Sequence, residues 1–288
     1  MRREIGNVSS PFFFISASNQ VPYPMKLIYG TAWKKERTAE LVELALRTGF
    51  RGIDTACQPK HYNEPGVGLG ISNSGIDRSE LFLQTKYTSV NGQDPLSIPY
   101  DPSAPLEIQI TKSLETSLKN LRTDYLDSLV MHSPMDTFEE TLEGWKVMEG
   151  FVKDGRVKQL GISNCYDFEY FRKLFNEVEQ KPAVLQNRFY SDSGYDVELR
   201  EFCLGNGVSY QGFWTLSANP DILESEVVVR LAEKYSVSAA VVFYRCLSER
   251  GVVSLCGTTC EGHMIEDLGL MGFGIEADEV GLVFGLCK

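Results

Sequence analysis

Short apolar strands alternate with amphipathic helices along most of the chain, and this alternation constrains the fold more than any other feature. Runs of aliphatic and β-branched residues predict strands at 26–31, 52–55, 81–85, 125–131, 157–162, 183–185, 208–213 and 252–255. Helical periodicity predicts helices at 36–49, 66–71, 106–121, 141–154, 168–178, 197–204, 225–235, 239–249 and 263–271. Alternation of this kind with short connections favours an α/β fold built on a parallel sheet.

Polar residues stand at the carboxyl ends of these predicted strands. Five of the strands end at or just before Thr31, Asp54, Lys86, His132 and Ser163. A (β/α)8 barrel carries its chemistry at this end of its strands. The competing doubly wound sheet usually carries a G-x-G-x-x-G phosphate turn, and this sequence has none. We therefore predict a single (β/α)8 TIM barrel, with residues 1–288 as one domain and residues 1–23 as a loose N-terminal lead-in.

Composition indicates which binding partners and which cellular compartment to expect. The formal net charge of −11 argues against binding to nucleic acid or to an anionic membrane, and no stretch is apolar enough to span a bilayer. Seven cysteines without a C-x-x-C pair indicate reduced thiols, so we expect a cytoplasmic protein. We also expect a monomer or weak oligomer. Cys256 and Cys260 have only His263 nearby as a further ligand candidate, so no metal site is predicted.

The stretch from Arg51 to Gly68, RGIDTACQPKHYNEPGVG, supplies an acid, an imidazole and a phenol after one strand, as Asp54, His61 and Tyr62. Because strand ends meet on one face of a barrel, we expect these groups to lie near Lys86 and His132. A long segment rich in Pro, Ser and Asp, residues 88–105, follows Lys86. We expect this loop to wall a substrate pocket.

Several short motifs along the chain resemble one family when they are taken together. In order they are GTAWKK from Gly30, GIDTA from Gly52, Tyr-Asn-Glu at 62–64 followed by VG, TK at 85–86, MHSP from Met131, GISN from Gly161, and Gln186. This series resembles the aldo-keto reductase superfamily, as a divergent branch with a Gln-Pro-Lys-His-Tyr-Asn-Glu loop. The resemblance runs from Thr31 to about Leu268. It implies a (β/α)8 barrel without a Rossmann domain, and NAD(P)H-dependent reduction of a small-molecule aldehyde or ketone to an alcohol.

The resemblance maps the family's catalytic tetrad onto Asp54, Tyr62, Lys86 and His132. Hydride attack on a carbonyl builds negative charge on oxygen, so a donor must stabilise and protonate that oxygen. A lysine in contact with a phenol is expected to lower the phenol's pKa, and a carboxylate holds the lysine in place. A neutral histidine can orient the carbonyl by a hydrogen bond.

One departure from the family pattern concerns the proton donor. The common spacing is Tyr-x-Asn-Glu, whereas Tyr62 directly precedes Asn63, His61 stands where Tyr would align, and residues 58–60 lengthen the loop. Adjacent residues of an extended loop point to opposite sides, so only one of the two side chains should face the pocket beside Lys86. Lys86 would repel a histidinium, which favours Tyr62 as the donor and leaves His61 as the alternative.

The resemblance also implies a binding site for NADP(H), possibly NAD(H). Its residues would be Thr31, Asp54, Ser163, Asn164, Gln186, Phe213, Trp214, Gly257, Thr258, Thr259 and His263. Ser163, Asn164 and Gln186 match the family's partners of the nicotinamide carboxamide, and Phe213 or Trp214 matches the ring that stacks on the nicotinamide. The loop after the last strand lacks the family's Lys and Arg, so backbone N–H groups remain to bind phosphate.

The expected substrate pocket contains Trp33, His61 and His132, with Trp214 beside them. Two other functions remain open because of the altered Tyr-Asn-Glu spacing and the weakened phosphate loop. One is a nucleotide-binding partner protein with poor turnover, and the other is a rearrangement or isomerisation enzyme that uses His61 and Lys86. The chain ends in the apolar stretch LVFGLC at 282–287, which we expect to pack on the floor or side of the barrel.

Overall fold

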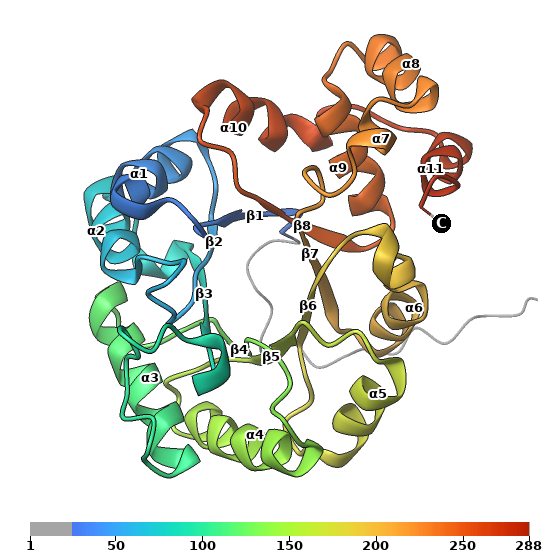
Figure 1. Cartoon of the computed structure of the whole chain (residues 1–288). Coiled ribbons are helices and arrows are strands. Elements are labelled where there is room, and N and C mark those ends of the chain that lie inside the picture. The colour runs from blue at the N-terminus through green and yellow to red at the C-terminus, as the bar shows by residue number, and fades with distance from the viewer. Residues whose placement is uncertain (1–24, 288) are drawn as a thin grey trace, which may run out of the picture.

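Eight parallel strands form a closed barrel in which every strand pairs with its neighbours in chain order (Figure 1). The computed structural model describes residues 25–287. The strands are β1 (Leu27–Gly30), β2 (Gly52–Asp54), β3 (Phe82–Tyr87), β4 (Ser128–Met131), β5 (Leu160–Ser163), β6 (Val184–Arg188), β7 (Ser209–Phe213) and β8 (Val252–Cys256). The predicted (β/α)8 TIM barrel is confirmed. The lead-in predicted at residues 1–23 lies outside the described residues.

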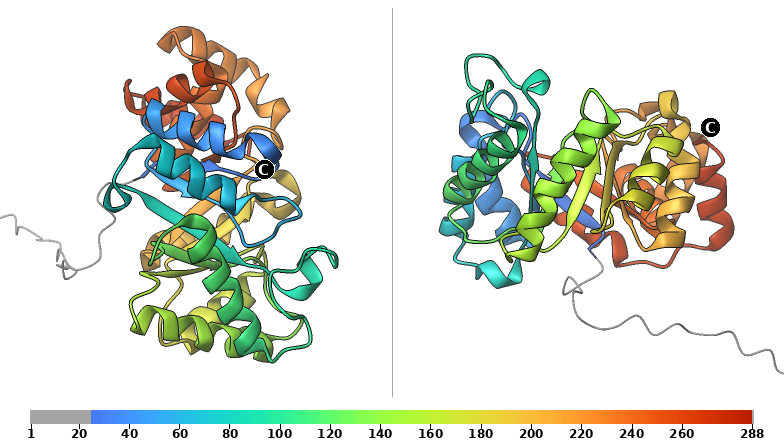
Figure 2. Two further views of the ribbon diagram at one scale, coloured as in Figure 1. Left: turned by 90° about the vertical axis from the view of Figure 1, so that its left-hand side faces the viewer. Right: turned by 90° about the horizontal axis from the view of Figure 1, so that it is seen from below.

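Helices surround this barrel on the outside, as the two side views of Figure 2 show. They are α1 (Thr38–Thr48), α2 (Glu64–Ser74), α3 (Leu106–Leu121), α4 (Phe138–Lys153), α5 (Phe168–Glu177), α6 (Val197–Asn206), α7 (Pro220–Leu223), α8 (Glu226–Tyr235), α9 (Ala239–Glu249), α10 (Glu261–Leu268) and α11 (Ala277–Phe284). Because helices cover the strands from outside, strands such as β4 are buried along their full length, which explains why their sequences are mostly apolar. No helix within residues 25–287 is long and apolar enough to cross a membrane.

Strand β3 is longer than the sequence predicted, and the difference matters for the site. It runs two residues past Thr85, so Lys86 lies inside the strand, paired in register with Val130 of β4, rather than after the strand's end. A lysine normally argues against a buried strand, but Lys86 is only 1% exposed and has a partner in the barrel interior. The Lys86 side chain therefore starts from a residue within the strand and not from the loop after it.

Helix α2 was predicted as a weak, glycine-broken segment at 66–71, but it is a continuous helix of 11 residues. Its glycines allow close packing against the helices on both sides. A Cβ atom on Gly68 would stand 2.2 Å from the backbone oxygen of Asn120 in α3, and one on Gly70 would stand 2.5 Å from that of Ala39 in α1. Packing against these neighbours, more than helix propensity, therefore fixes α2.

The C-terminal region differs from the prediction in its helix boundaries. Helix α10 begins at Glu261, two residues before the predicted start, and α11 was not predicted at all. The sequence around α11 is interrupted by glycines, which weakened its helical signal. Val280 and Val283 are buried, and α11 packs against α8 and α9 (Figure 1). The apolar tail thus packs on the outer side of the barrel, as expected.

The glycines of two helices provide a matched test of this packing. Gly68→Ala should lower the free energy of unfolding by roughly 1–3 kcal/mol, because the added methyl group would overlap the α3 backbone. Gly150→Ala in α4 meets no atom within 4 Å and should raise it by about 0.5–1 kcal/mol. Urea denaturation followed by circular dichroism measures both. A Gly68→Ala protein as stable as the unmodified chain would contradict this account of α2.

Candidate active site

A cavity of about 770 Å³ opens at the carboxyl ends of the strands. It brings together most of the residues predicted for the site: Trp33, Asp54, His61, Tyr62, His132, Ser163, Asn164, Gln186, Phe213, Trp214, Gly257, Thr258 and His263. Three predicted residues do not line it. Lys86 and Thr31 are buried behind the wall, and Thr259 lies on the β8–α10 loop outside the lining. Residues more than 200 positions apart therefore share one cavity.

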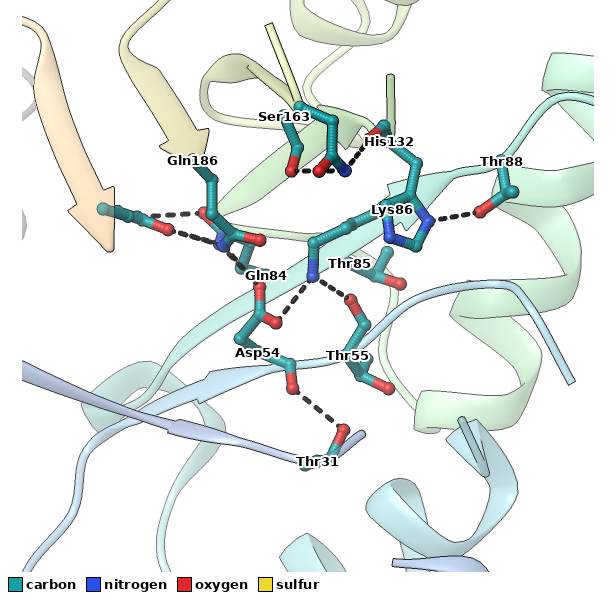
Figure 3. Close-up of polar contacts among 12 residues, drawn as sticks. Thr31, Asp54, Thr55, Gln84, Thr85, Lys86, Thr88, His132, Ser163 and Gln186 are labelled. Carbon is teal, nitrogen blue, oxygen red and sulfur yellow. Dashed lines mark hydrogen bonds and ion pairs between the residues drawn. The ribbon is translucent and has the colours of Figure 1, made fainter. Parts of the chain in front are cut away.

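Lys86 and Asp54 form a buried ion pair beneath this cavity (Figure 3). Lys86 Nζ lies 2.6 Å from Asp54 Oδ2 and donates a second hydrogen bond to the backbone oxygen of Thr55 at 2.9 Å. Thr31 Oγ1 donates to the backbone oxygen of Asp54 at 2.9 Å, so Thr31 acts on the strand rather than on the cavity. Burial lowers the pKa of Lys86, and the negative charge of Asp54 opposes that shift.

Three glutamines from different strands complete the layer around the ion pair. Gln84 and Gln186 each donate from Nε2 to Asp54 Oδ1, at 2.7 and 3.0 Å, and both also donate to Gln211 Oε1. The amide N–H groups of Gln186 are thus engaged with the barrel interior (Figure 3). Within residues 25–287 its Oε1 accepts no hydrogen bond, which leaves that oxygen for a ligand in the cavity.

Tyr62 lies beside the ion pair and His132, whereas His61 packs against Trp33. Lys86 Nζ is 5.4 Å from the centre of the Tyr62 ring, and the Tyr62 and His132 rings are 6.0 Å apart. The His61 ring lies 3.8 Å from that of Trp33. Both residues line the cavity, with the Tyr62 ring near Lys86 and the His61 ring against Trp33. The loop is a turn, not an extended segment, because Gln58 O accepts from the backbone N–H groups of both His61 and Tyr62.

The protonation states of these groups follow from their burial. Burial, followed by the charge of Asp54, raises the pKa of Tyr62, opposite to the direction expected from Lys86. Burial lowers the pKa of His132 to about 3, with further contributions from Lys86 and His61. Burial and then Lys60 lower the pKa of His61. At neutral pH the phenol is therefore protonated and the His132 imidazole is neutral.

Thr88 orients His132 and was not predicted from the sequence. Its Oγ1 lies 2.6 Å from His132 Nδ1, and Asn164 Nδ2 donates to the backbone oxygen of His132 at 2.8 Å. The available signal was spacing, because Thr88 stands two residues after Lys86 and alternation along a strand places such residues on one side. The contact fixes the plane of the imidazole ring.

The long segment at residues 88–105 does not wall the pocket as expected, because none of its residues lines the cavity. It supports the β2–α2 loop instead. Gln93 Nε2 donates to the backbone oxygen of Cys57 at 2.9 Å, and Gln58 Nε2 donates to that of Gly92 at 2.7 Å. The residues inserted in the β2–α2 loop are thus held in place by the loop that follows β3.

The far end of the cavity contains a lysine that was not predicted as a site residue. Lys34 follows β1, and its Nζ donates to the backbone oxygen of Gly257 in the β8–α10 loop. Tyr29 also donates to that loop, at the backbone oxygen of Thr258, over 3.0 Å. Lys34, Gly257 and Thr258 all line the cavity. The contact spans 223 residues, so no local pattern could have revealed it.

The cysteines take part in local packing. All seven are free thiols, and six of them are buried. Cys256 donates to Asp267 Oδ2 at 3.2 Å, while Cys260 is exposed. No cluster of three or more His, Cys, Asp or Glu side chains that could hold a metal ion occurs in the part of the chain that the structure describes.

Comparison with known proteins identifies the family. The family model described as "Aldo/keto reductase family" matches residues 26–219. The chain is 31% identical to the glyoxal reductase of Bacillus subtilis over 250 residues, 86% of this chain and 83% of that protein. It is 28% identical to the NAD/NADP-dependent indole-3-acetaldehyde reductase of Schizosaccharomyces pombe over 280 residues, 91% of each.

A solved structure agrees with these sequence matches. The aldo/keto reductase of Brucella melitensis superimposes with a TM-score of 0.78 at 27% identity, covering 91% of this chain and 94% of that one. The fold, the sequence matches and the cavity at the strand ends therefore all point to the same family. The chain belongs to the aldo/keto reductase family, as an oxidoreductase that reduces carbonyl groups to alcohols.

Proposed function

We propose that the protein reduces a small or medium-sized aldehyde or ketone with NADPH or NADH as the hydride donor, using Asp54, Tyr62, Lys86 and His132. The observation that carries the proposal is the buried Lys86–Asp54 pair, which lies next to Tyr62 at the base of the cavity. Two relatives are named as a glyoxal reductase and an NAD/NADP-dependent aldehyde reductase, which supports an aldehyde substrate and a nicotinamide cofactor.

The residues along the cavity fit a dinucleotide. Ser163, Asn164 and the free Oε1 of Gln186 offer polar partners for a carboxamide, and Phe213 offers an aromatic face. At the other end the backbone of Gly257 and Thr258 meets Lys34, whose charge suits a diphosphate. When bound, the cofactor supplies a hydride to the carbonyl carbon. Seven free thiols support a reducing compartment, so we place the enzyme in the cytosol.

Each catalytic residue then has a distinct task. Tyr62 donates its proton to the carbonyl oxygen as negative charge develops there, and Lys86 stabilises the phenolate that remains. Asp54 keeps Lys86 charged and in position despite its burial. Thr88 donates to Nδ1 of His132 in the tautomer that leaves a proton on Nε2, and Nε2–H orients the carbonyl oxygen.

Replacement of the lysine separates chemistry from binding. Lys86→Met should abolish carbonyl reduction, because the phenolate of Tyr62 loses its cation, while the dissociation constant for NADPH stays within a few-fold. Steady-state rates and fluorescence titration measure the two quantities. Removal of one partner of a buried ion pair can also destabilise the fold. The double variant Lys86→Met, Asp54→Asn removes the unpaired carboxylate as well, so it should recover stability but not turnover.

Retained turnover in Lys86→Met would remove Lys86 from the catalytic group. An unmodified protein that binds NADPH but oxidises it with no carbonyl compound would instead favour a nucleotide-binding partner protein.

The two candidate donors are distinguished by a pair of substitutions. Tyr62→Phe should lower kcat by about a hundredfold or more, the usual scale for loss of a general acid. His61→Ala should change kcat far less, because its ring packs on Trp33 rather than beside Lys86. Single-turnover rates with a saturating aldehyde measure both effects. The opposite ranking of the two variants would make His61 the proton donor.

Cofactor selectivity should be modest. A bidentate Arg–phosphate contact contributes roughly 1.5–3 kcal/mol, and the β8–α10 loop, residues 257–260, contains no Lys or Arg to make one with a 2′-phosphate. We expect the dissociation constants of NADPH and NADH to differ by about tenfold or less. Lys34→Met should weaken both cofactors alike, because they share the diphosphate. A thousandfold preference for NADPH would show that another basic residue binds its 2′-phosphate.

A further inference from the structure

Arg188 is a cation in the cavity that the proposed chemistry does not use. It is the last residue of β6, and it lies two positions beyond Gln186 on that strand and opposite Phe213 of β7. Its side chain lines the same cavity as Tyr62 and His132. A charged side chain that is partly removed from water is costly unless it has a hydrogen-bonding or ionic partner.

Residues 25–287 provide no acceptor for the Arg188 guanidinium. Within residues 25–287 the Arg188 side chain makes no ion pair within 4.0 Å and donates no hydrogen bond, and its Nε is buried without a partner. Buried N–H groups are almost always satisfied in folded proteins, so an unpaired one in a cavity points to a ligand. The backbone of Arg188 is held, in contrast, because its N–H donates to the Tyr166 hydroxyl at 3.1 Å.

Aromatic rings hold the guanidinium in place without using its donors. Its central carbon lies 4.2 Å from the centre of the Trp214 ring and 5.0 Å from that of Tyr190. Contacts with ring faces leave the in-plane N–H groups free to form a fork that matches a carboxylate or phosphate. Trp214 adopts a left-handed backbone conformation, with φ of 58°, which is uncommon for a bulky residue and often marks a functional position.

The charges of the other cavity residues make Arg188 the available anchor for an anion. Asp54 is already paired with Lys86, and Glu266 and Asp267 carry the wrong sign to bind an anion. Lys34 contacts the β8–α10 loop, where the proposed function assigns it to the cofactor's diphosphate. The protein as a whole carries a net charge of −11 and repels anions, so capture of an anionic substrate needs a local cation. The Arg188 guanidinium, which lines the same cavity as Tyr62 and His132, meets that need.

We propose that Arg188 binds an anionic group of the carbonyl substrate, a carboxylate or a phosphate, and so selects oxo acids or phosphorylated aldehydes over neutral carbonyl compounds. This proposal rests on the proposed function, because it assumes that the cavity receives a carbonyl substrate. The planar, fixed donors of Arg suit bidentate binding of either anion. Arg188 would act in recognition and take no part in proton transfer.

Matched pairs of substrates test the proposal. Succinic semialdehyde and butanal have the same number of carbons and differ in the carboxylate, and glyceraldehyde 3-phosphate and glyceraldehyde differ in the phosphate. The unmodified enzyme should favour one charged member by about tenfold or more in kcat/KM. Arg188→Met should lower kcat/KM for that substrate by about 10–100-fold, mainly through KM, and change that for its neutral partner by less than about threefold.

Two further variants serve as controls. Arg188→Lys keeps the charge but loses the fork, so its loss should be intermediate. Arg230→Met removes the same charge from an exposed position on α8 outside the cavity, and it should alter neither substrate pair. Comparison of the two charged substrates tells a carboxylate site from a phosphate site.

Three results would overturn the proposal. The first is that the unmodified enzyme shows no preference for a charged substrate. The second is that Arg188→Met lowers kcat/KM equally for both members of a substrate pair. The third is that Arg188→Met raises only the dissociation constants of NADPH and NADH, which would assign Arg188 to the cofactor's diphosphate. If the enzyme reduces no carbonyl compound at all, the proposed function fails separately. In that case anion binding is measured directly, by the quenching of tryptophan fluorescence on addition of succinic semialdehyde or glyceraldehyde 3-phosphate. If Arg188 binds the anion, Arg188→Met must abolish this quenching.

Discussion

The buried ion pair between Lys86 and Asp54 is the interaction on which both the barrel interior and the site depend. Two charges removed from water are costly unless their geometry is good and their other hydrogen-bonding positions are filled. Here Asp54 also accepts from Gln84 and Gln186, and Lys86 donates to Thr55. Strands β2, β3 and β6 thus meet at one carboxylate. The layer that fills the barrel also fixes the Lys86 cation beneath the cavity. Because the proposed chemistry uses this cation, a change at the pair is expected to affect stability and turnover together.

The sequence predicted the features that depend on local periodicity. Eight strands in the correct order, and Asp54, His132 and Ser163 at the cavity, follow from apolar runs that end in polar residues. Contacts between distant segments leave no such pattern. The Lys34 contact with the β8–α10 loop and the extension of β3 through Lys86 depend on partners that periodicity does not show. The support of the β2–α2 loop by residues 88–105 is of the same kind.

The spacing of His61 and Tyr62 shows why counting residues could not decide between the two candidate proton donors. The count assumed an extended loop, in which neighbouring side chains diverge. Gln58 instead closes a turn, Gln93 ties the β2–α2 loop to the loop after β3, and both His61 and Tyr62 line the cavity. His61 and Tyr62 differ in their neighbours. The His61 ring packs against Trp33, while the Tyr62 ring lies near Lys86 and His132.

Protonation states support the same choice by a separate route. A group that gives up a proton at neutral pH must carry one there. Burial lowers the pKa of both His61 and His132, so neither is an imidazolium at neutral pH, and each can donate a hydrogen bond but no acidic proton. The raised pKa of Tyr62 keeps its phenol protonated. A phenol with a raised pKa is a weak acid in the resting site, but the proton moves only as the carbonyl oxygen becomes an alkoxide, a much stronger base. In the proposed mechanism the phenolate then forms beside Lys86, and the positive charge of Lys86 stabilises it.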